Sequence, residues 1–365
     1  MLFSGAELLE QQRYPYGESN EKHKRCNNDA TKGAYCLTLA SFILESMSPS
    51  HLQAVRDACA RVAREARWVQ LEPKQLHTYA QSLQSQPLPH YDPVHHYLGD
   101  AETTLAYVMT LDAVNFGSGY FPALRKRPGM SGYFTVASSL KDYFDQHGAM
   151  TASALQAVSL EQCCAIFGQD PEQPEQRELM AHFQRAWQDL GALLLEHYAG
   201  SFVTFIEAAQ HSVDKLLALL IAMPYFQDEA HYHGFRVPLY KRAQITASDL
   251  ALAFAGQGYG YFHDLATLTI FADNLVPHVL RCDGILRYDP ALLATIEAGE
   301  LLEAGSEAEV EIRAVALHAV EQLVDRLRAQ GQPLCAQQLD VMLWNRGQAA
   351  HYKQQPRHRC RTVFY

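Results

Sequence analysis

Apolar residues recur at helical spacing along most of this 365-residue chain. In residues 310–331, VEIRAVALHAVEQLVDRLRAQG, the apolar side chains from Val310 to Val324 fall on one broad stripe, and Gly331 ends the segment. Strand patterns are few and short, at 68–71, 132–136 and 235–240. The sequence therefore predicts a mainly α fold with a few short strands. The predicted helices are 100–114, 135–146, 151–166, 175–196, 203–221, 246–255, 273–282, 308–329 and 334–350.

The first fifty residues differ from the rest of the chain. The stretch GESNEKHKRCNNDATKG, residues 17–33, is polar and rich in Asn and Gly, which is typical of a loosely attached segment. Helical spacing then begins, with Ser50 as the expected N-cap. We predict a partly flexible N-terminal extension, residues 1–50, and a single helical domain, residues 51–365.

Charge and cysteine usage narrow the class of protein. The net charge is −10 and no long Lys/Arg cluster occurs, so a nucleic-acid surface is not expected. Eight cysteines occur without a CxxC pair, which indicates reduced thiols in a cytoplasmic protein. The apolar stretch at 34–44 is too short to cross a membrane, and the N-terminus lacks the basic start of a signal peptide.

Several catalytic motifs are missing from the sequence. No glycine-rich loop between a strand and a helix is present, so a dinucleotide or a Walker-type phosphate loop is not expected. The chain also lacks GxSxG and HExxH, and its Cys and His residues are not at zinc spacing. We therefore expect no metal and no cofactor.

Polar residues embedded in aromatic, core-like segments are the main sign of a site. They occur in LDAVNFGSGYFP, PLYKRAQITASDL, TIFADNLVP and LDVMLW, which together resemble a pocket with stacking walls and a few placed polar groups. Each has an ordinary interpretation too. Asp273 could cap the helix that contains Pro277, and Asp340 could lie on a solvated helix face. Lys241 and Arg242 could pair with surface carboxylates such as Asp249 or Glu229.

Taken together and in order, these motifs resemble the queuosine salvage protein family, the queuosine 5′-phosphate N-glycosylase/hydrolases. The matching strings are LDAVNFGSGYFP, SGYFTVASSL, GSFVTFIEAA, VPLYKRAQITASDL, LTIFADNLVPHVLRCDGILRYDPAL, EVEIRAVALHAVEQL and LDVMLW, and the chain ends in TVFY. The resemblance covers about residues 60–365. It implies a fold similar to that of helical DNA glycosylases, no metal, and hydrolysis of queuosine 5′-monophosphate to release queuine, a 7-deazaguanine base re-inserted into tRNA.

The resemblance also implies residue roles. Asp273 falls at the catalytic carboxylate and Phe271 at a base-contacting position. Asp340 matches a ligand-binding aspartate, and a binding histidine falls at His96, or at His95 if a short gap is placed differently. Where eukaryotic members have Tyr and Asp after that aspartate, this chain has Val341 and Asn345.

The chemistry of N-glycoside cleavage suits these residue types. Positive charge builds on the ribose, and a carboxylate near the anomeric carbon stabilises or captures it. A 7-deaza base has no N7 to protonate, so base-edge hydrogen bonds carry more of the leaving-group activation. Asp340 could accept such bonds from the N–H edge. For the 5′-phosphate we select Lys241, beside Tyr240 and ahead of a helix.

Two other functions stay open at this point. One is a glycosylase that acts on a modified base in nucleic acid, against which the net charge of −10 argues. The other is a protein that binds a deazapurine without turnover. Under the leading interpretation the partners are the small-molecule substrate and product alone, with no nucleic acid and no membrane, and the protein is a monomer.

Overall fold

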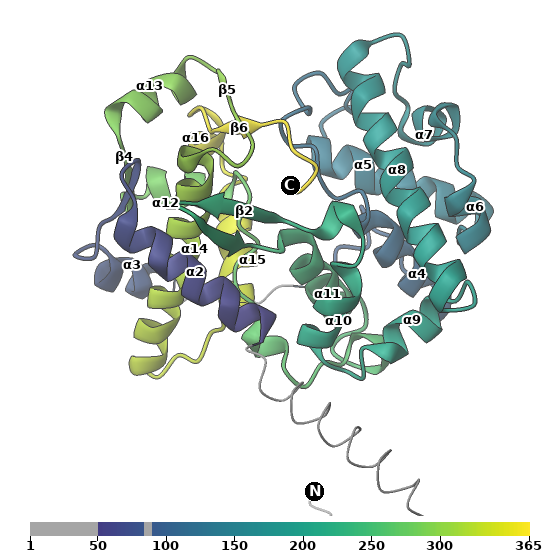
Figure 1. Cartoon of the computed structure of the whole chain (residues 1–365), viewed down its shortest axis with the longest axis horizontal. Helices are drawn as coiled ribbons and strands as arrows, with labels where there is room; N and C mark the ends of the chain where they lie inside the picture. The colour runs from purple at the N-terminus through teal and green to yellow at the C-terminus, as the bar shows by residue number, and fades with distance from the viewer. Residues whose placement is uncertain (1–49, 84–89) are drawn as a thin grey trace, which may run out of the picture. The chain divides into compact units, whose positions relative to one another are not determined.

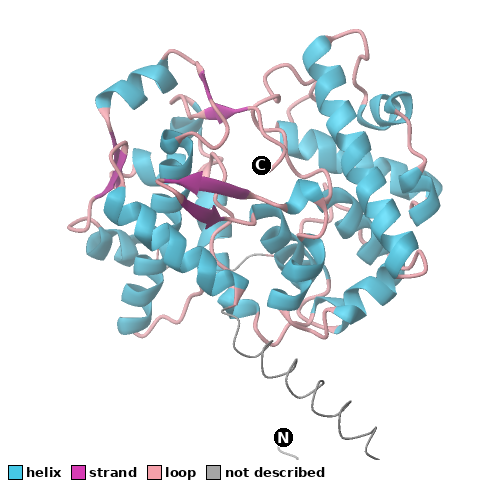
Figure 2. Cartoon of the chain, in the orientation of Figure 1, coloured by secondary structure: helices cyan, strands magenta, loops and turns pink. Residues whose placement is uncertain are grey.

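Helices make up most of the computed structural model, which describes residues 50–83 and 90–365 (Figures 1 and 2). The mainly α fold is therefore confirmed, while the predicted extension 1–50 lies almost wholly outside the described residues. The longer helices are α2 (His51–Glu65), α4 (Ala101–Asp112), α5 (Gly132–His147), α8 (Pro174–His197), α11 (Lys241–Ala253), α14 (Glu307–Ala329) and α15 (Ala336–Arg346). The shorter ones are α3 (Leu76–Ser82), α6 (Ala152–Gln156), α7 (Leu160–Phe167), α9 (Phe202–Ala208), α10 (Val213–Leu220), α12 (Val276–Cys282), α13 (Pro290–Glu297) and α16 (Ala350–Lys353).

The strands form three small two-stranded sheets within the described ranges. β1 (Val69–Leu71) pairs antiparallel with β4 (Leu286–Tyr288). β2 (Glu229–Tyr232) and β3 (Phe235–Pro238) form a hairpin, and β5 (Leu301–Leu302) runs parallel to β6 (Arg359–Cys360). The sheets therefore tie distant loops together rather than forming a central layer.

The helices gather into two groups inside the unit Pro49–Tyr365. In one group α14 is central and packs against α2, α3, α12 and α15. In the other, α8 packs against α6 and α7, while α4 contacts α5, α9 and α11 (Figure 1). Helix α14 is buried along most of its length, as its broad apolar stripe predicts. None of the helices in the described ranges has the length and apolar character that crossing a membrane requires.

Three sequence predictions are wrong in detail. Residues 132–136 are not a strand but the start of α5, because Ser131 caps the helix by accepting a hydrogen bond from the Phe134 N–H. The predicted helix 151–166 is α6 and α7, separated by a turn that ends at the N-cap Ser159. The predicted helix 203–221 is α9 and α10, separated where Gln210 and His211 adopt positive φ angles of 51° and 59°.

Two helix starts are informative. Ser50 accepts a hydrogen bond from the Leu52 N–H, so the predicted N-cap of α2 is confirmed. Helix α11 begins at Lys241, five residues before the predicted 246, so residues 241–244 of the polar YKRAQ stretch are helical and Tyr240 is the N-cap. Most of its first turn is buried, and this places Lys241 inside the protein.

Candidate active site

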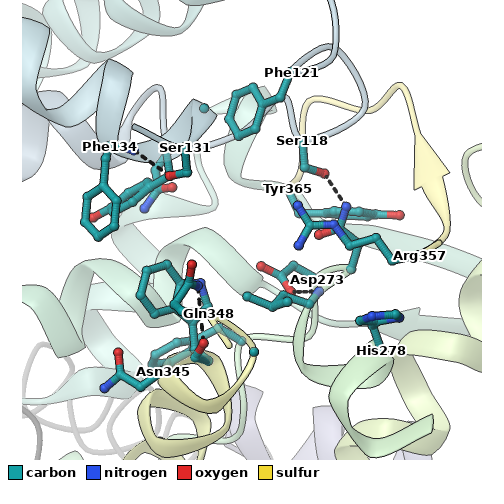
Figure 3. A pocket seen from close by; sticks show the side chains of 18 of the residues that line it. Ser118, Phe121, Ser131, Phe134, Asp273, His278, Asn345, Gln348, Arg357 and Tyr365 are labelled. Carbon is teal, nitrogen blue, oxygen red and sulfur yellow. Dashed lines mark hydrogen bonds between the residues drawn. The ribbon is translucent and has the colours of Figure 1, made fainter. Parts of the chain in front are cut away.

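A pocket of about 850 Å³ lies where the two helix groups meet, a volume in the range of small-molecule sites. Its lining comes mainly from the segments 90–96 and 115–121, the start of α5, one face of α11, the loop 271–275, α15 and the segment 352–359. Figure 3 shows Phe134 of α5, Asp273 of the loop, Asn345 of α15 and Arg357 around a common space. All seven side chains that the sequence analysis selected line this pocket, namely His96, Lys241, Phe271, Asp273, Asp340, Val341 and Asn345.

Asp273 lies in the loop that precedes α12 and points toward the centre of the pocket (Figure 3). One carboxyl oxygen, Oδ1, accepts a hydrogen bond of 2.7 Å from the Leu275 N–H. The N-cap of α12 is Leu275, so the interpretation of Asp273 as that helix's N-cap is wrong. The bond to Leu275 closes a turn ahead of the helix and fixes the carboxyl group while leaving Oδ2 for the pocket.

Asp340 is buried beneath the same loop, with 4% of its surface exposed. Its Oδ1 accepts a hydrogen bond of 2.8 Å from the Phe271 N–H, which links α15 to the loop that carries Asp273. Burial, together with the nearby Asp273 carboxylate, raises the pKa of Asp340 to about 8. The solvated-helix interpretation is therefore wrong, and the raised pKa favours the protonated form of Asp340 at neutral pH.

Lys241 is also buried and lines the pocket, with 5% of its surface exposed. Burial lowers the pKa of its ammonium group, while the carboxyl groups of Asp273 and Asp340 act in the opposite direction. Surface ion pairing is therefore the wrong interpretation for Lys241. Arg242 is likewise internal, since its guanidinium donates to the Asp112 and Ala113 carbonyl oxygens and lies over the Phe116 ring.

A buried ion pair supports both Asp273 and Lys241. Arg313 donates from Nε to the Ala272 carbonyl at 2.8 Å, and its two other nitrogens contact the Asp228 oxygens at 3.0 and 2.6 Å. Asp228 Oδ2 in turn accepts the Lys241 N–H at 3.0 Å. The Arg313–Asp228 pair thus connects the loop of Asp273 to the first residue of α11. Sequence reasoning missed this pair, although Arg313 stood within the apolar stripe of its helix.

One wall of the pocket is aromatic. Trp344 makes edge-on contacts with the Tyr133 and Phe134 rings at 6.1 and 5.9 Å between centroids. His96 Nδ1 lies 2.9 Å from the Asp92 carbonyl, so it carries the proton, and Nε2 accepts from the Tyr133 hydroxyl at 2.8 Å. Burial lowers the pKa of His96, which keeps the ring neutral.

The structure separates the two candidate histidines. His96 lines the pocket, whereas the His95 ring lies against Phe134 and its Nδ1 contacts the Ser138 hydroxyl at 3.0 Å. Val341 and Asn345 follow Asp340 on α15 and face the same pocket, with Asn345 exposed. Arg357, which the sequence analysis did not select, is close enough to Asp273 for an electrostatic interaction (Figure 3).

Asp249 of α11 and Asp112 of α4 form a second pair of carboxyl groups at the pocket. Asp249 lines the pocket, and burial raises its pKa to about 7. Behind it, Asp112 is fully buried, its Oδ2 has no hydrogen-bond partner, and burial together with Asp249 raises its pKa well above the ordinary value. No group of three or more His, Cys, Asp or Glu side chains in the described ranges is arranged to hold a metal ion.

The fold and the pocket define a helical protein with a carboxylate-centred small-molecule site. The family model described as queuosine salvage protein matches residues 95–365, so the chain belongs to that family. A relative from Sphaerobacter thermophilus, named queuosine 5′-phosphate N-glycosylase/hydrolase, is 40% identical over 74% of this chain and 84% of its own length. Relatives with the same name from Mus musculus and Dictyostelium discoideum are 33% and 34% identical, over 73% and 72% of this chain and 83% and 79% of their own lengths.

Proposed function

We propose that this chain hydrolyses the N-glycosidic bond of queuosine 5′-phosphate and releases queuine for salvage into tRNA. The observation that carries the proposal is the placement of Asp273, whose Oδ1 is fixed by Leu275 while the carboxyl group faces an aromatic-walled pocket beside Lys241 and Asp340. The names of the relatives support the same substrate and bond.

Asp273 acts on the ribose. As the bond between the anomeric carbon and the base breaks, its electron pair leaves with the base and positive charge develops on the sugar. The Asp273 carboxylate stabilises this charge, and it does so more strongly inside a protein than in water because the surroundings screen it less. Water then supplies the oxygen that bonds to the anomeric carbon, and the products are queuine and ribose 5-phosphate.

Asp340 acts on the leaving base. A 7-deaza base has no N7 to protonate, so its negative charge must be offset elsewhere. A neutral Asp340 accepts a hydrogen bond from the exocyclic amine through one oxygen and offers its own proton to an adjacent ring nitrogen through the other. The raised pKa of Asp340, about 8, supports this protonated form.

The remaining predicted contacts follow from the pocket lining. Phe271 packs on the base, and His96, with Tyr133, supplies polar contacts at the aromatic wall. Val341 and Asn345 contact the substrate from α15. Lys241 binds the 5′-phosphate, supported by its buried ammonium group in the pocket floor, for which the described residues provide no ion-pair partner.

Product analysis tests the proposal. The protein is incubated with queuosine 5′-phosphate, and free queuine and ribose 5-phosphate are sought by chromatography and mass spectrometry. We expect both products in equal amounts, and no base release from guanosine 5′-phosphate at a comparable rate. Tight binding without products would support a deazapurine-binding protein instead. Inhibition by short oligonucleotides would support a glycosylase that acts on nucleic acid.

The cellular setting is part of the proposal. We place the enzyme in the cytoplasm as a monomer that uses no metal or cofactor and acts on the free nucleotide rather than on nucleic acid. The six cysteines in the described ranges are free thiols, which supports a reducing compartment. The net charge of −10 supports a small-molecule substrate over a nucleic acid.

A further inference from the structure

One carboxyl group in the pocket differs from the others. Among the described residues, the acidic side chains that line the pocket are Asp92, Asp249, Asp273 and Asp340. Asp92 accepts a hydrogen bond from the Val94 N–H, and Asp273 and Asp340 accept theirs from backbone N–H groups as described above. Asp249 has neither a hydrogen-bond donor nor an ion-pair partner within the described part of the chain.

Asp249 occupies a defined position along α11. The residues of this helix that line the pocket are Lys241, Ile245, Asp249 and Leu252, which form a single stripe along one face. Lys241 and Asp249 are eight residues apart, so their backbones lie about 12 Å apart along the helix axis. The pocket therefore presents a cation at one end of this stripe and a carboxyl group two turns away, with the apolar Ile245 between them.

The surroundings of Asp249 favour a cation. Burial and, after it, the charge of Asp249 raise the pKa values of the Tyr91 and Tyr133 hydroxyl groups, so both hydroxyl groups lie within electrostatic range of Asp249. Both also line the pocket. A carboxylate beside aromatic rings binds ammonium groups through charge and through the ring faces together. A carboxyl group that has no ion-pair partner of its own is stabilised in its ionised form by an ammonium group that binds beside it.

The proposed substrate carries a cation of this kind. Queuosine is a 7-deazaguanosine with an aminomethyl arm at C7, and the secondary amine of that arm, which also bears a dihydroxycyclopentene ring, is protonated near neutral pH. The nucleotide is therefore a dianion at its phosphate and a cation at its arm. Along this face of α11, the cation of Lys241 is complementary to the phosphate, and the carboxyl group of Asp249 is complementary to the amine of the arm.

We propose that Asp249, with Tyr91 and Tyr133, forms the subsite that binds the protonated amine of the substrate's side arm. The inference rests on the proposed function and deepens it, because it assigns a specific residue to the feature that distinguishes queuosine from other 7-deazaguanosines. Asp249 is thus a specificity residue, which contacts the substrate away from the N-glycosidic bond.

Three substrates and one isosteric variant test the subsite. Wild type and Asp249→Asn are compared on queuosine 5′-phosphate, on 7-aminomethyl-7-deazaguanosine 5′-phosphate, which keeps the amine without the ring, and on 7-deazaguanosine 5′-phosphate, which lacks the arm. We expect Asp249→Asn to lose roughly 10- to 100-fold in kcat/KM on both amine-bearing substrates, as for loss of a hydrogen-bonded charge pair. On the substrate without an arm the change should stay within about threefold.

The controls separate the possible failures. Asp189→Asn changes a half-buried helical carboxyl group outside the pocket, on α8, and should alter none of the three rates. Asp249→Glu, which keeps the charge, should restore part of the preference for the amine, and thermal melting checks that each variant is folded.

The outcomes are distinct. Equal losses on all three substrates would overturn the subsite and make Asp249 a structural or catalytic group. A loss confined to queuosine 5′-phosphate would overturn the amine assignment in favour of the diol ring. Wild-type protein that turns over queuosine 5′-phosphate while Asp249→Asn behaves normally would contradict this inference alone. Wild-type protein without turnover would overturn the proposed function and the inference with it.

Discussion

Replacing Arg313 with lysine tests whether the buried ion pair positions Asp273. The substitution keeps the positive charge but removes the planar fork of donors. In the structure one nitrogen of Arg313 contacts the Ala272 carbonyl, the neighbour of Asp273, while the two others contact Asp228. A lysine ammonium group is a single point on a flexible stem, so it can stay with Asp228 but cannot also hold Ala272.

The size of the effect follows from the bonds that are lost. A hydrogen bond to a charged group contributes about 1.5–3 kcal/mol, and breaking a buried ion pair completely costs about 3–5 kcal/mol. Because Arg313→Lys keeps part of the pair, we expect the free energy of unfolding to fall by about 2–4 kcal/mol. A loop shift of about 1 Å at a reacting group can cost about 100-fold in rate, so kcat should fall about 10- to 100-fold.

Urea denaturation and steady-state kinetics measure the two effects separately. The change in KM should be smaller than that in kcat, because Arg313 reaches the pocket lining through the Ala272 carbonyl and the Tyr365 ring rather than through the wall of Tyr133 and Trp344. Arg56→Lys is the control, since Arg56 forms a half-buried pair with Glu321 at 2.9 Å outside the pocket lining. A variant Arg313→Lys that loses stability as expected but keeps the wild-type kcat would refute the positioning role.

Two further variants test the other buried charges. Asp340→Asn keeps an acceptor for Phe271 but has no acidic proton, so steady-state assays should show kcat about 100-fold lower, and an unchanged kcat would contradict the role. The pKa of Asp340 in the folded protein, about 8, lies above its value in the unfolded chain, so the wild-type protein becomes less stable as the pH rises from about 4 to about 8. Asp340→Asn lacks this ionisation and should therefore melt at a higher temperature than the wild type at pH 7 in calorimetry. For the same reason, kcat/KM of the wild type should fall above about pH 8. Lys241→Ala should shrink the preference for queuosine 5′-phosphate over queuosine while activity on the nucleoside stays constant. Equal losses on both would place the phosphate elsewhere.

The sequence predicted the helices that are long enough for the helical spacing of their apolar residues to be recognised. Helices α4, α8 and α14 each span at least three turns, and apolar spacing identifies them. Helices α3, α13 and α16 have seven, eight and four residues, which is too short for the pattern to emerge. The false strand at 132–136 came from the bulky aromatic residues Tyr133 and Phe134, whose burial against Trp344 is a tertiary effect.

The site was predictable where a carboxylate interrupts an apolar run. Asp273 and Asp340 stand out for that reason, since burial of an acid needs a partner or a use. Asp249 follows polar residues of α11, so its direction into the pocket is visible only in the structure. Asp228 and Arg313 are 85 residues apart, and no local pattern links two halves of such a pair.

Single-turnover hydrolysis by Asp273→Asn is the most direct test of the central claim, that the Asp273 carboxylate acts on the transition state of N-glycoside cleavage. Wild type and variant, each in excess over queuosine 5′-phosphate, are followed for queuine release, and binding of the nucleotide is measured in parallel by calorimetry. In line with that claim, we expect a rate at least about 100-fold lower in the variant, with the dissociation constant changed by less than about tenfold. Queuine release by Asp273→Asn at a rate close to that of the wild type would contradict it.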